Sequence, residues 1–595
     1  SGLFFALPTQ ATSNGMFSRL VNWVNVLDGG RHSMELVHSN AQFNDDFKKL
    51  NRIRSNNIDV DDDAGAAVYQ WFEGRKKSML ADFVVGTVDQ LLQLALKQKH
   101  VMLRHVALMN KVVIIDECHA YDAYMNVYLK RALNWLGRYK VPVILLSATL
   151  PAAKRDDLVR AYLNRDAATS RRRRRDIQNE EANSDYPLMT YTDGDNVLQK
   201  HVEAGVMPLN VKVNRIYEND VVDLLEDLLS DGGCAAIIVN TVKHAQELAE
   251  RLKAEFGDDV SLLHSRFTAT DRISKEDILR KQLGKAGTDT KRPHRLIVVG
   301  TQVIEQSLDI DFDVMISELC PIDLLLQRMG RLHRHNRNRP DKLKKAQCFV
   351  LKCEDENIDK GSAAVYGEYM LMRTEVVLPD EINIPDDVSQ LVQTVYGEDD
   401  GIIQHSLEQY AKAKEEWMRG IGEKERKAEE FRIGDPNPDD VEYIGELFGN
   451  IDDDNGYIDG ADNIDDIQAE ASVRDINDSF DAIVIRRDSD GMLHLLSNDM
   501  TLEITTPDDT TAKLIARESI RMPRELCMPY RIDKAIEYIE KQASEIVSKW
   551  QASPWLKGSL VLMLNEQNEA SILGYKLKYD SFYGLTCTKE DEANE

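Results

Sequence analysis

The chain has 595 residues and a formal net charge of −27, with 43% hydrophobic and 29% charged residues. One hydrophobic core does not organise a chain of this length, so we expect a globular protein of three or four domains. No apolar run approaches the roughly 20 residues that cross a bilayer, and the first residues lack the basic start of a signal peptide. These features argue against a membrane or secreted protein and predict a cytoplasmic one.

The cysteines and the acidic residues limit the ligands to expect. The seven cysteines form no CxxC pair, which predicts reduced thiols and no zinc site. A strongly negative chain is a poor partner for nucleic acid, because phosphates are neutralised by Lys and Arg. However, 13 acidic residues lie between Arg432 and Arg474, where no Lys or Arg occurs, and the remaining −14 leaves room for a local basic channel.

Short apolar stretches alternate with helix-length segments from the N-terminus onward. The first five read LFFALPT, MELVHS, DFVVGT, KVVIIDE and VPVILLSAT, and each ends in a polar or glycine-containing turn. Apolar strands that alternate with helices predict a parallel, doubly wound α/β sheet. The pattern restarts between about 209 and 355, so we expect two tandem lobes, over 1–205 and 206–358.

The rest of the chain predicts a linker and a smaller domain. Residues 359–470 have the charged, helical character of a linker or accessory layer. Within them, an acidic tract at about 434–468 has too little apolar content to form a core. Residues 471–595 combine strand-like DAIVIRRD with helix-like KAIEYIEKQASEIVSKW, which predicts a small α+β C-terminal domain.

The strongest local signal is VVIIDECHAYD, where an apolar strand ends at two adjacent carboxylates. Ligands of α/β sheets bind at the carboxyl ends of the strands. A nucleotide hydrolase needs one carboxylate for Mg²⁺ and a second to polarise the attacking water, roles that suit Asp116 and Glu117. His119 is a further catalytic candidate. The alternative is a solvated strand end followed by a helix cap.

Polar residues at later strand ends complete the set of motifs. The SAT sequence contains Ser147 and Thr149, whose hydroxyls can hydrogen-bond the DECH side chains and sense the nucleotide. In VVGTQVIEQSLDIDFD, the first part suits phosphate contacts and Asp309 suits the ribose side of a nucleotide. QRMGRLHRH carries Gln327, Arg331 and Arg334, which we expect on one short helical segment.

The spacing of these arginines suggests a role in catalysis. Arg331 and Arg334 are three residues apart and would share one helix face. An arginine that faces a γ-phosphate contributes about 10³ to 10⁵ in rate. A solvated basic face, or general phosphate binding, is the alternative interpretation.

In this order the motifs resemble motifs II, III, V and VI of superfamily-two helicases. The stretches LPTQATSNGMF, VGTVDQLL, DECHAYD and CPIDLLLQRMGRLHRH narrow the resemblance to the CRISPR-associated helicase-nuclease of type I interference. ASVRDI (471–476) and YDSFYGL (579–585) are similar to its C-terminal domain. The resemblance implies two RecA-like lobes, the first incomplete at its N-terminus, followed by the helical linker and the C-terminal domain.

The resemblance also implies function. It implies an ATP-dependent motor with Mg²⁺ that moves on single-stranded DNA and is recruited by the Cascade surveillance complex and its guide RNA. The implied DNA contacts are Pro8, Thr9, Gln10, Thr87, Asn240, Thr241, His264, Thr301 and Gln302. Phosphate contacts suit a motor that accepts any sequence. A strand-end threonine is also a common helix cap, so capping is the alternative for several of them.

Two features of the family do not occur in this sequence. The family has a glycine-rich phosphate loop just before motif Ia and, ahead of it, an HD-type metal nuclease domain. No histidine of the chain is followed by Asp, and residues 1–7 already read as the strand that leads into motif Ia. We therefore expect a missing N-terminal segment to supply both, and the chain alone to be inactive.

Several readings stay open. The arginine run Arg171–Arg175 suits either DNA phosphates or a solvated loop. IDDDNGYIDGAD imitates a calcium loop, but it begins with Ile451 and ends with Asp462 where Glu is usual, so we predict no calcium site. The functional alternatives are a different DECH-box helicase for RNA or DNA repair, and an inactive binding or assembly fragment.

Overall fold

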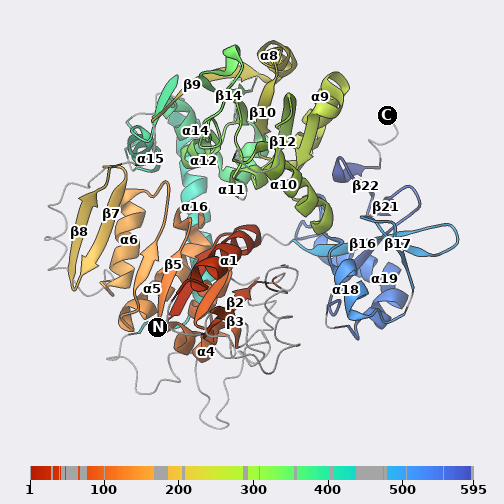
Figure 1. Cartoon of the computed structure of the whole chain (residues 1–595), viewed down its shortest axis with the longest axis horizontal. Helices are drawn as coiled ribbons and strands as arrows, with labels where there is room; N and C mark the ends of the chain where they lie inside the picture. The colour runs from red at the N-terminus through yellow and green to blue at the C-terminus, as the bar shows by residue number, and fades with distance from the viewer. Residues whose placement is uncertain are drawn as a thin grey trace, which may run out of the picture. The chain divides into compact units, whose positions relative to one another are not determined.

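The structure is a computed structural model of the chain (Figure 1). It describes residues 2–27, 31–38, 41, 44, 47, 65–67, 77–98, 101–165, 185–203, 205, 208–285, 292–306, 309–353, 358–397, 399–401, 407–436, 473–474, 479–503, 505–553 and 555–590. The chain divides into two compact units. The first comprises Ser1–Val206 and Val388–Ile476, and the second comprises Met207–Asp387 and Asn477–Glu595. No helix in these ranges is both long and apolar enough to cross a membrane.

The first lobe is built on a six-stranded parallel sheet with the order β3-β2-β4-β1-β5-β6. Its strands are β1 Gly2–Leu7, β2 Arg31–Val37, β3 Gly65–Ala67, β4 Phe83–Thr87, β5 Lys111–Ile115 and β6 Val143–Leu145. Its helices are α1 Gln10–Val24, α3 Val88–Leu92, α4 Val101–Leu108, α5 Ala123–Arg138 and α6 Ala152–Tyr162. A hairpin of β7 Leu188–Asp193 and β8 Asn196–His201 follows, which the sequence analysis did not predict.

Alternating strand residues place a helix layer on each face of this sheet. Phe83 and Val85 of β4 pack in one core with Phe17 of α1. The intervening residue Val84 packs in a second core with Tyr128 of α5. Because successive side chains of a strand point to opposite faces, both faces are covered. This confirms the predicted doubly wound α/β architecture.

The second lobe has a seven-stranded sheet with the order β11-β12-β10-β13-β14-β9-β15. All neighbours are parallel except the edge strand β15, which is antiparallel to β9. The strands are β9 Leu209–Tyr217, β10 Gly233–Ile238, β11 Val260–Leu263, β12 Arg295–Gly300, β13 Val314–Glu318, β14 Ala346–Lys352 and β15 Glu381–Ile384. The helices are α8 Val221–Leu228, α9 Val242–Phe256, α10 Ala269–Leu283, α11 Val303–Gln306 and α12 Ile322–Met329.

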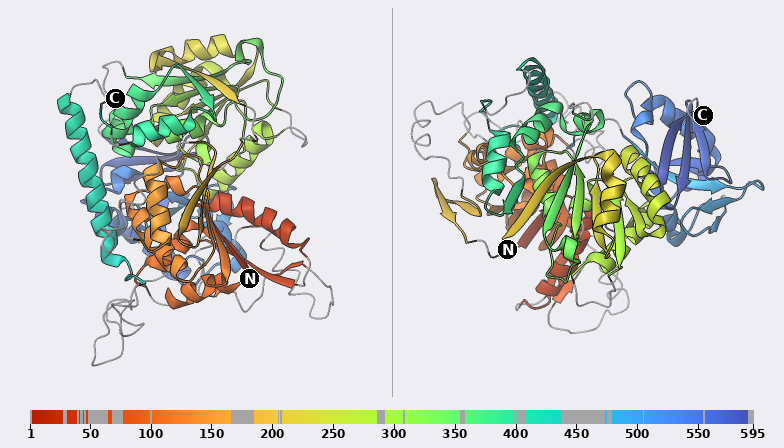
Figure 2. Two further views of the ribbon diagram at one scale, coloured as in Figure 1. Left: turned by 90° about the vertical axis from the view of Figure 1, so that its left-hand side faces the viewer. Right: turned by 90° about the horizontal axis from the view of Figure 1, so that it is seen from above.

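Residues 359–470 do not form one separate layer. Helices α13 Lys360–Tyr366 and α14 Glu368–Val377 belong to the second unit, whereas α15 Val388–Tyr396 and α16 Leu407–Phe431 belong to the first. The long helix α16 packs against α5 of the first lobe (Figure 2). Polar contacts accompany this division between the two units. Ser362 accepts a hydrogen bond from Asn240 of the second lobe, while Gln393 accepts one from the backbone N–H of Ala152 in the first lobe. The acidic tract beyond residue 436, Arg171–Arg175 and the calcium-like stretch lie outside the described residues.

The C-terminal domain has the predicted α+β composition. One sheet contains β16 Asp481–Arg487, β17 Leu493–Leu495, β18 Thr501–Leu502, β19 Ser519–Arg521 and β20 Leu560–Leu564. A second, antiparallel sheet contains β21 Glu569–Ile572, β22 Tyr575–Asp580 and β23 Gly584–Lys589. The helices are α18 Asp509–Ala516 and α19 Ile532–Trp550. This domain lies beside α10 of the second lobe (Figures 1 and 2).

Candidate functional site

The polar motifs of the first lobe meet at one edge of its sheet. The parallel register sets Leu7 opposite Thr87, Ala6 opposite Ile115, and Ile115 opposite Leu145. Four neighbouring strands therefore end at the same level. Because each motif follows its strand directly, the segments around Thr9, Thr87, Asp116 and Ser147 share the edge where α/β sheets bind ligands.

The two carboxylates at the end of β5 have different environments. Burial raises the pKa of the Asp116 carboxyl, and the hydrogen bond that its Oδ1 accepts from the Glu117 N–H, at 3.1 Å, opposes this rise. Glu117 adopts a left-handed backbone with φ of 52°, which is uncommon for a residue with a side chain. Its side chain is 40% exposed. One carboxylate is thus partly desolvated while its neighbour is accessible.

His119 connects the DECH segment to the SAT segment. Its Nδ1 lies 2.9 Å from Ser147 Oγ and 3.4 Å from Glu117 Oε2, and the side chain is only 3% exposed. Lys154 fixes the same turn by donating to the backbone carbonyls of His119 and Tyr121. The hydroxyl–DECH contact expected from the SAT motif is therefore present for Ser147. Within the described residues, the buried Thr149 hydroxyl has no hydrogen-bond partner.

The expected DNA contacts of the first lobe lie beside this edge. Thr9 caps α1, since its Oγ1 accepts from the N–H of Thr12 at 3.2 Å, and Gln10 is the first residue of that helix. Thr87 is 6% exposed and caps α3 by position, without a side-chain hydrogen bond to the helix. The carbonyl of Pro8 accepts a hydrogen bond from Arg474, which also pairs with Asp89 at 2.7 Å. Arg474 belongs to the ASVRDI segment and was not predicted at this edge.

The expected DNA contacts of the second lobe also share one strand edge, since Ile238 and Leu263 are both in register with Gly300. Thr301 follows β12 and is 3% exposed. Gln302 Nε2 donates to the carbonyl of Asn240 at 3.1 Å and to the Tyr366 hydroxyl at 2.9 Å. Thr241 caps α9 by accepting from the N–H of His244.

Asn240 and His264 do not fit the expectation of direct DNA contact. Asn240 is 3% exposed, and its amide donates to Leu319 and Ser362 while its Oδ1 accepts from Arg328. His264 is fully buried, and its two ring nitrogens bond the carbonyl of Tyr583 and the N–H of Arg266. Both side chains use their hydrogen-bonding groups inside the protein, so tertiary packing removes them from solvent.

The segment after α12 differs from the predicted helix. The helix ends at Met329, and Gly330 follows as its C-cap, so Gln327 is helical but Arg331 and Arg334 are not. Leu332 pairs with Phe312 in an isolated β-bridge, and turn residues flank it on both sides, so the chain does not continue as a helix. The shared helix face expected for the two arginines is therefore wrong. The reason is this long-range backbone pairing, which is absent from the local sequence pattern.

Arg334 and Asp309, both expected at the nucleotide, lie side by side. The distance between Arg334 Nε and Asp309 Oδ1 is 2.6 Å, and the two side chains are 40% and 50% exposed. Burial by itself would raise the pKa of the Asp309 carboxyl. The hydrogen bond and the charge of Arg334 outweigh burial, so the pKa of Asp309 lies below its usual value. Arg331 donates instead to the backbone carbonyl of Glu305. The exposed pair remains accessible to a ligand.

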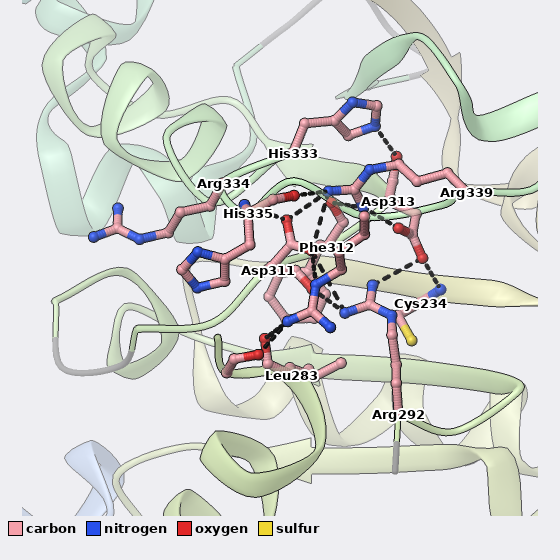
Figure 3. Close-up of polar contacts among 12 residues, drawn as sticks. Cys234, Leu283, Arg292, Asp311, Phe312, Asp313, His333, Arg334, His335 and Arg339 are labelled. Atoms are coloured by element: carbon pink, nitrogen blue, oxygen red, sulfur yellow. Dashed lines mark hydrogen bonds and ion pairs between the residues drawn. The ribbon is translucent and has the colours of Figure 1, made fainter. Parts of the chain in front are cut away.

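Sequence reasoning missed the buried ion pairs that hold this segment. Arg328 and Glu305 are both fully buried and bond at 2.6 Å. Asp311, also fully buried, pairs with Arg337 at 2.7 Å and with Arg339 at 2.8 Å. Figure 3 shows Arg292 and Arg339 converging on Asp311 and Asp313. The alternating arginines of RHNRNRP and the repeated Asp of DIDFD were the available signal.

A cavity at the carboxyl ends of β9, β13 and β14 has an acidic lining, unlike the arginine-rich segment after α12. It has a volume of about 360 Å³, and its lining includes Glu218, Glu318, Asp359 and Glu375. His244 bonds Glu218 at 2.9 Å and Glu318 at 2.6 Å, and despite burial these carboxylates raise its pKa to about 10. Four carboxylates repel phosphate, so this cavity does not suit a nucleotide.

Three family models match the chain. They are described as DEAD/DEAH box helicase, matching 31–158, as CRISPR-associated nuclease/helicase Cas3, C-terminal, matching 231–337, and as Cas3 C-terminal domain, matching 474–585. They match parts of the first lobe and of the second lobe, and most of the C-terminal domain.

Full-length relatives agree with these matches. The chain is 43% identical to the CRISPR-associated nuclease/helicase Cas3 of Streptococcus thermophilus, over 100% of this chain and 64% of that protein. The crystal structure of T. fusca Cas3 with AMPPNP matches 98% of this chain and 65% of that one, with 27% identity and a TM-score of 0.79. A chain of a CRISPR RNA-guided surveillance complex in a pre-nicking state covers 98% of this chain and 67% of its own length, with 25% identity and a TM-score of 0.68. The chain thus spans slightly less than two thirds of the first two proteins.

Proposed function

The chain belongs to the CRISPR-associated Cas3 nuclease/helicase family, and from this premise we propose that it is an ATP-driven motor that moves along single-stranded DNA. The observation that carries the proposal is the end of β5, where Asp116 precedes Glu117, and Glu117 lies beside His119, which contacts Ser147. The T. fusca relative, whose crystal structure contains AMPPNP, supports nucleotide binding by this chain.

The two carboxylates divide the hydrolytic work. Burial disfavours the negative charge of Asp116, so a divalent cation beside it would stabilise the ionised form, which fits Mg²⁺. The cation would neutralise charge on the phosphates when bound. Glu117 is accessible and orients the attacking water. His119 lies within 2.9 Å of Ser147 Oγ and 3.4 Å of Glu117 Oε2, which gives the SAT segment a means to respond to the nucleotide.

In the second lobe, arginine side chains offer positive charge that suits the phosphates of a nucleotide. Arg334 serves as the arginine finger, with Arg331 and Gln327 nearby and Asp309 toward the ribose. An arginine donates two parallel hydrogen bonds to carboxylate or phosphate alike. The present pairing of Arg334 with Asp309 therefore supports its capacity to bind a phosphate at the same position.

Each lobe contacts single-stranded DNA through its own strand-end residues. We assign phosphate contacts to the segments around Pro8, Thr9 and Gln10, around Thr87, around Thr241, and around Thr301 and Gln302. Asn240 and His264 act as positioning residues behind them, because their side chains are committed to internal hydrogen bonds. Contacts of this kind position a strand without reading its sequence.

The proposal also covers how the motor reaches its DNA and which sequence provides the phosphate loop. The relative in the surveillance complex supports delivery of the motor to foreign DNA by Cascade and its guide RNA. The 595 residues contain no Gly-Lys-Ser or Gly-Lys-Thr sequence. We therefore propose that turnover depends on a phosphate loop and DNA degradation on an HD nuclease domain contributed by further sequence. Family membership disfavours an unrelated RNA or repair helicase, and DNA-stimulated turnover would separate the motor from a passive binding module.

The decisive experiment replaces Glu117 with Gln in the protein that carries both the chain and the phosphate loop. We expect DNA-stimulated ATP hydrolysis to fall about 10² to 10⁴-fold while nucleotide and DNA binding persist, because only water activation is lost. Asp157→Asn, a surface change on α6, is the matched control and should leave turnover unchanged. Equal loss of binding and turnover would instead show that Glu117 is structural.

A further inference from the structure

The YDSFYGL segment at 579–585 forms the tip of a hairpin that contacts the second lobe. Strand β22 ends at Asp580 and β23 begins at Gly584, so residues 581–583 are the connection. Asp580 Oδ1 accepts from the N–H groups of Phe582 at 2.7 Å and Tyr583 at 2.9 Å, which fixes the turn. The turn of the tip is therefore held by contacts within its own hairpin.

Backbone groups of the tip are bonded by the second lobe. The carbonyl of Tyr583 accepts from His264 Nε2 at 3.0 Å and from Gln246 Nε2 at 2.8 Å. The N–H of Leu585 donates to the carbonyl of Arg266 at 2.8 Å. A buried polar group that loses such a partner destabilises the folded state. Separation of the domain from the lobe would remove the partners of His264 Nε2 and of the Arg266 carbonyl.

Side chains of the tip complete the interface. Phe582 and Tyr583 pack against the hydrophobic core of the second lobe, and Lys253 Nζ lies 3.6 Å from the centre of the Phe582 ring. The Tyr579 hydroxyl accepts from the N–H of Thr268 at 3.3 Å and donates to Asp271. Both residues belong to the N-terminus of α10, so the tip contacts three separate segments of the lobe.

Gly584 permits the close approach. Its φ is +69°, and a Cβ there would lie 2.5 Å from the carbonyl oxygen of Arg266 and 2.8 Å from His264 Cε1. Gly574, in the turn before β22, has a similar φ of +78° but open space around it. The two glycines share the same backbone requirement, and only the first also faces the lobe.

We propose that residues 579–585 are a clasp that makes the C-terminal domain and the second lobe one cooperative body, with His264 as a positioning residue of the clasp. The domain then follows the second lobe in any movement of that lobe. The clasp does not depend on the proposed ATPase or DNA binding, and it is tested without nucleotide or DNA.

The test is amide hydrogen exchange of the full chain, comparing Gly584→Ala with Gly574→Ala. Both changes strain a left-handed backbone, but only Gly584→Ala clashes with the lobe. We expect Gly584→Ala to speed exchange about tenfold both in 579–587 and in 264–272 of the lobe, because a cooperative unit opens as a whole. Gly574→Ala should affect only its own turn. Unchanged protection of 264–272 in Gly584→Ala would overturn the clasp.

Gln246→Glu keeps the test decisive if Gly584→Ala fails to fold. The change is isosteric and lies on α9 of the lobe, but an ionised carboxylate cannot donate to the carbonyls of Tyr583 and Leu585. Faster exchange in 579–587, caused by a change on the opposite side of the interface, is the expected result. Exchange of 579–587 at the wild-type rate would show that the domain is held independently of the lobe.

Discussion

Two neighbouring arginines of the second lobe have opposite environments. Arg334 is 40% exposed, and among the described residues it bonds the accessible carboxylate of Asp309 and the backbone carbonyl of Gly330. Arg328 is fully buried and donates to Glu305, Ser317 and Asn240. A guanidinium in the first environment is free to exchange carboxylate for phosphate, whereas one in the second organises the protein around it. Substitution of Arg334 should therefore affect catalysis, and substitution of Arg328 should affect stability.

We expect Arg334→Ala to reduce DNA-stimulated ATP turnover by a large part of about 10³ to 10⁵-fold, with little change in melting temperature. Arg334→Lys should restore little, because Lys lacks the planar fork. Arg328→Ala should instead destabilise the protein by about 3 to 5 kcal/mol, since it leaves Glu305 buried without its partner. Steady-state turnover and thermal unfolding measure the two effects. Near-normal turnover of Arg334→Ala would return this residue to a solvated basic face.

A buried carboxyl in the C-terminal domain should make stability depend on pH. Glu518 is fully buried, and burial raises its pKa to about 7, against the hydrogen bonds from Ser497. The folded state favours the protonated form of Glu518. The contribution of this group to the free energy of unfolding is therefore fully present below about pH 4.5 and is lost as pH rises through 7. Glu518→Gln keeps the shape without the charge. We expect the variant to gain up to about 3 kcal/mol relative to wild type between pH 4.5 and 8.

Denaturant unfolding at several pH values checks this prediction. The difference in unfolding free energy between wild type and variant should change mainly between pH 4.5 and 7. Two parallel stability curves over that interval would show that Glu518 is ionised in the folded protein at no cost.

At the scale of elements, the end of α16 is tied to the first lobe. The Trp135 indole donates to the carbonyl of Gly434 at 3.2 Å, and Arg131, 4% exposed, pairs with Asp435. The N–H of Ile433 donates to the carbonyl of Ala95. The start of the acidic tract is therefore part of the packed lobe, although its composition alone predicts no core.

Two deletions distinguish the contribution of the Gly434 and Asp435 contacts from that of the rest of the acidic tract. Deletion of 434–468 should cost roughly 1 to 3 kcal/mol more stability than deletion of 437–468, because it also removes the Gly434 carbonyl that Trp135 bonds and the Asp435 carboxylate that pairs with the buried Arg131. Thermal unfolding of the two variants provides the comparison. Equal melting temperatures would show that these contacts contribute nothing to stability.

At the scale of the whole molecule, the net charge of −27 is a poor guide to its ligands. The acidic residues concentrate between Arg432 and Arg474 and around the cavity beside His244, whereas the segment after α12 carries the exposed Arg334 beside Arg337 and Arg339, which pair with the buried Asp311. Local charge, not the total, determines where phosphates bind.

Binding of single-stranded DNA should therefore be tolerant of sequence and steeply dependent on salt. The logarithm of the affinity should fall with the logarithm of salt concentration by about 0.7 per phosphate neutralised. Fluorescence anisotropy with unrelated oligonucleotides at several salt concentrations measures both properties. An affinity independent of salt, or a strong preference for one sequence, would contradict the proposed phosphate track.

The sequence by itself determined the features that depend on local pattern. Alternating apolar strands and helices predicted both α/β lobes, and the polar residues after each strand predicted which segments share the ligand edge. These inferences succeed because strand period, helix period and turn chemistry act over a few residues, and parallel strands bring their ends together.

Tertiary structure alone decided the features whose partners are distant in the chain. His264 is buried because Tyr583, 319 residues later, bonds its ring. Arg331 and Arg334 leave the helix because Leu332 pairs with Phe312. Residues 359–470 divide between the two units because Ser362 bonds the second lobe and Gln393 the first. No local pattern encodes these contacts, since each depends on surfaces that exist only after the sheets have formed and packed.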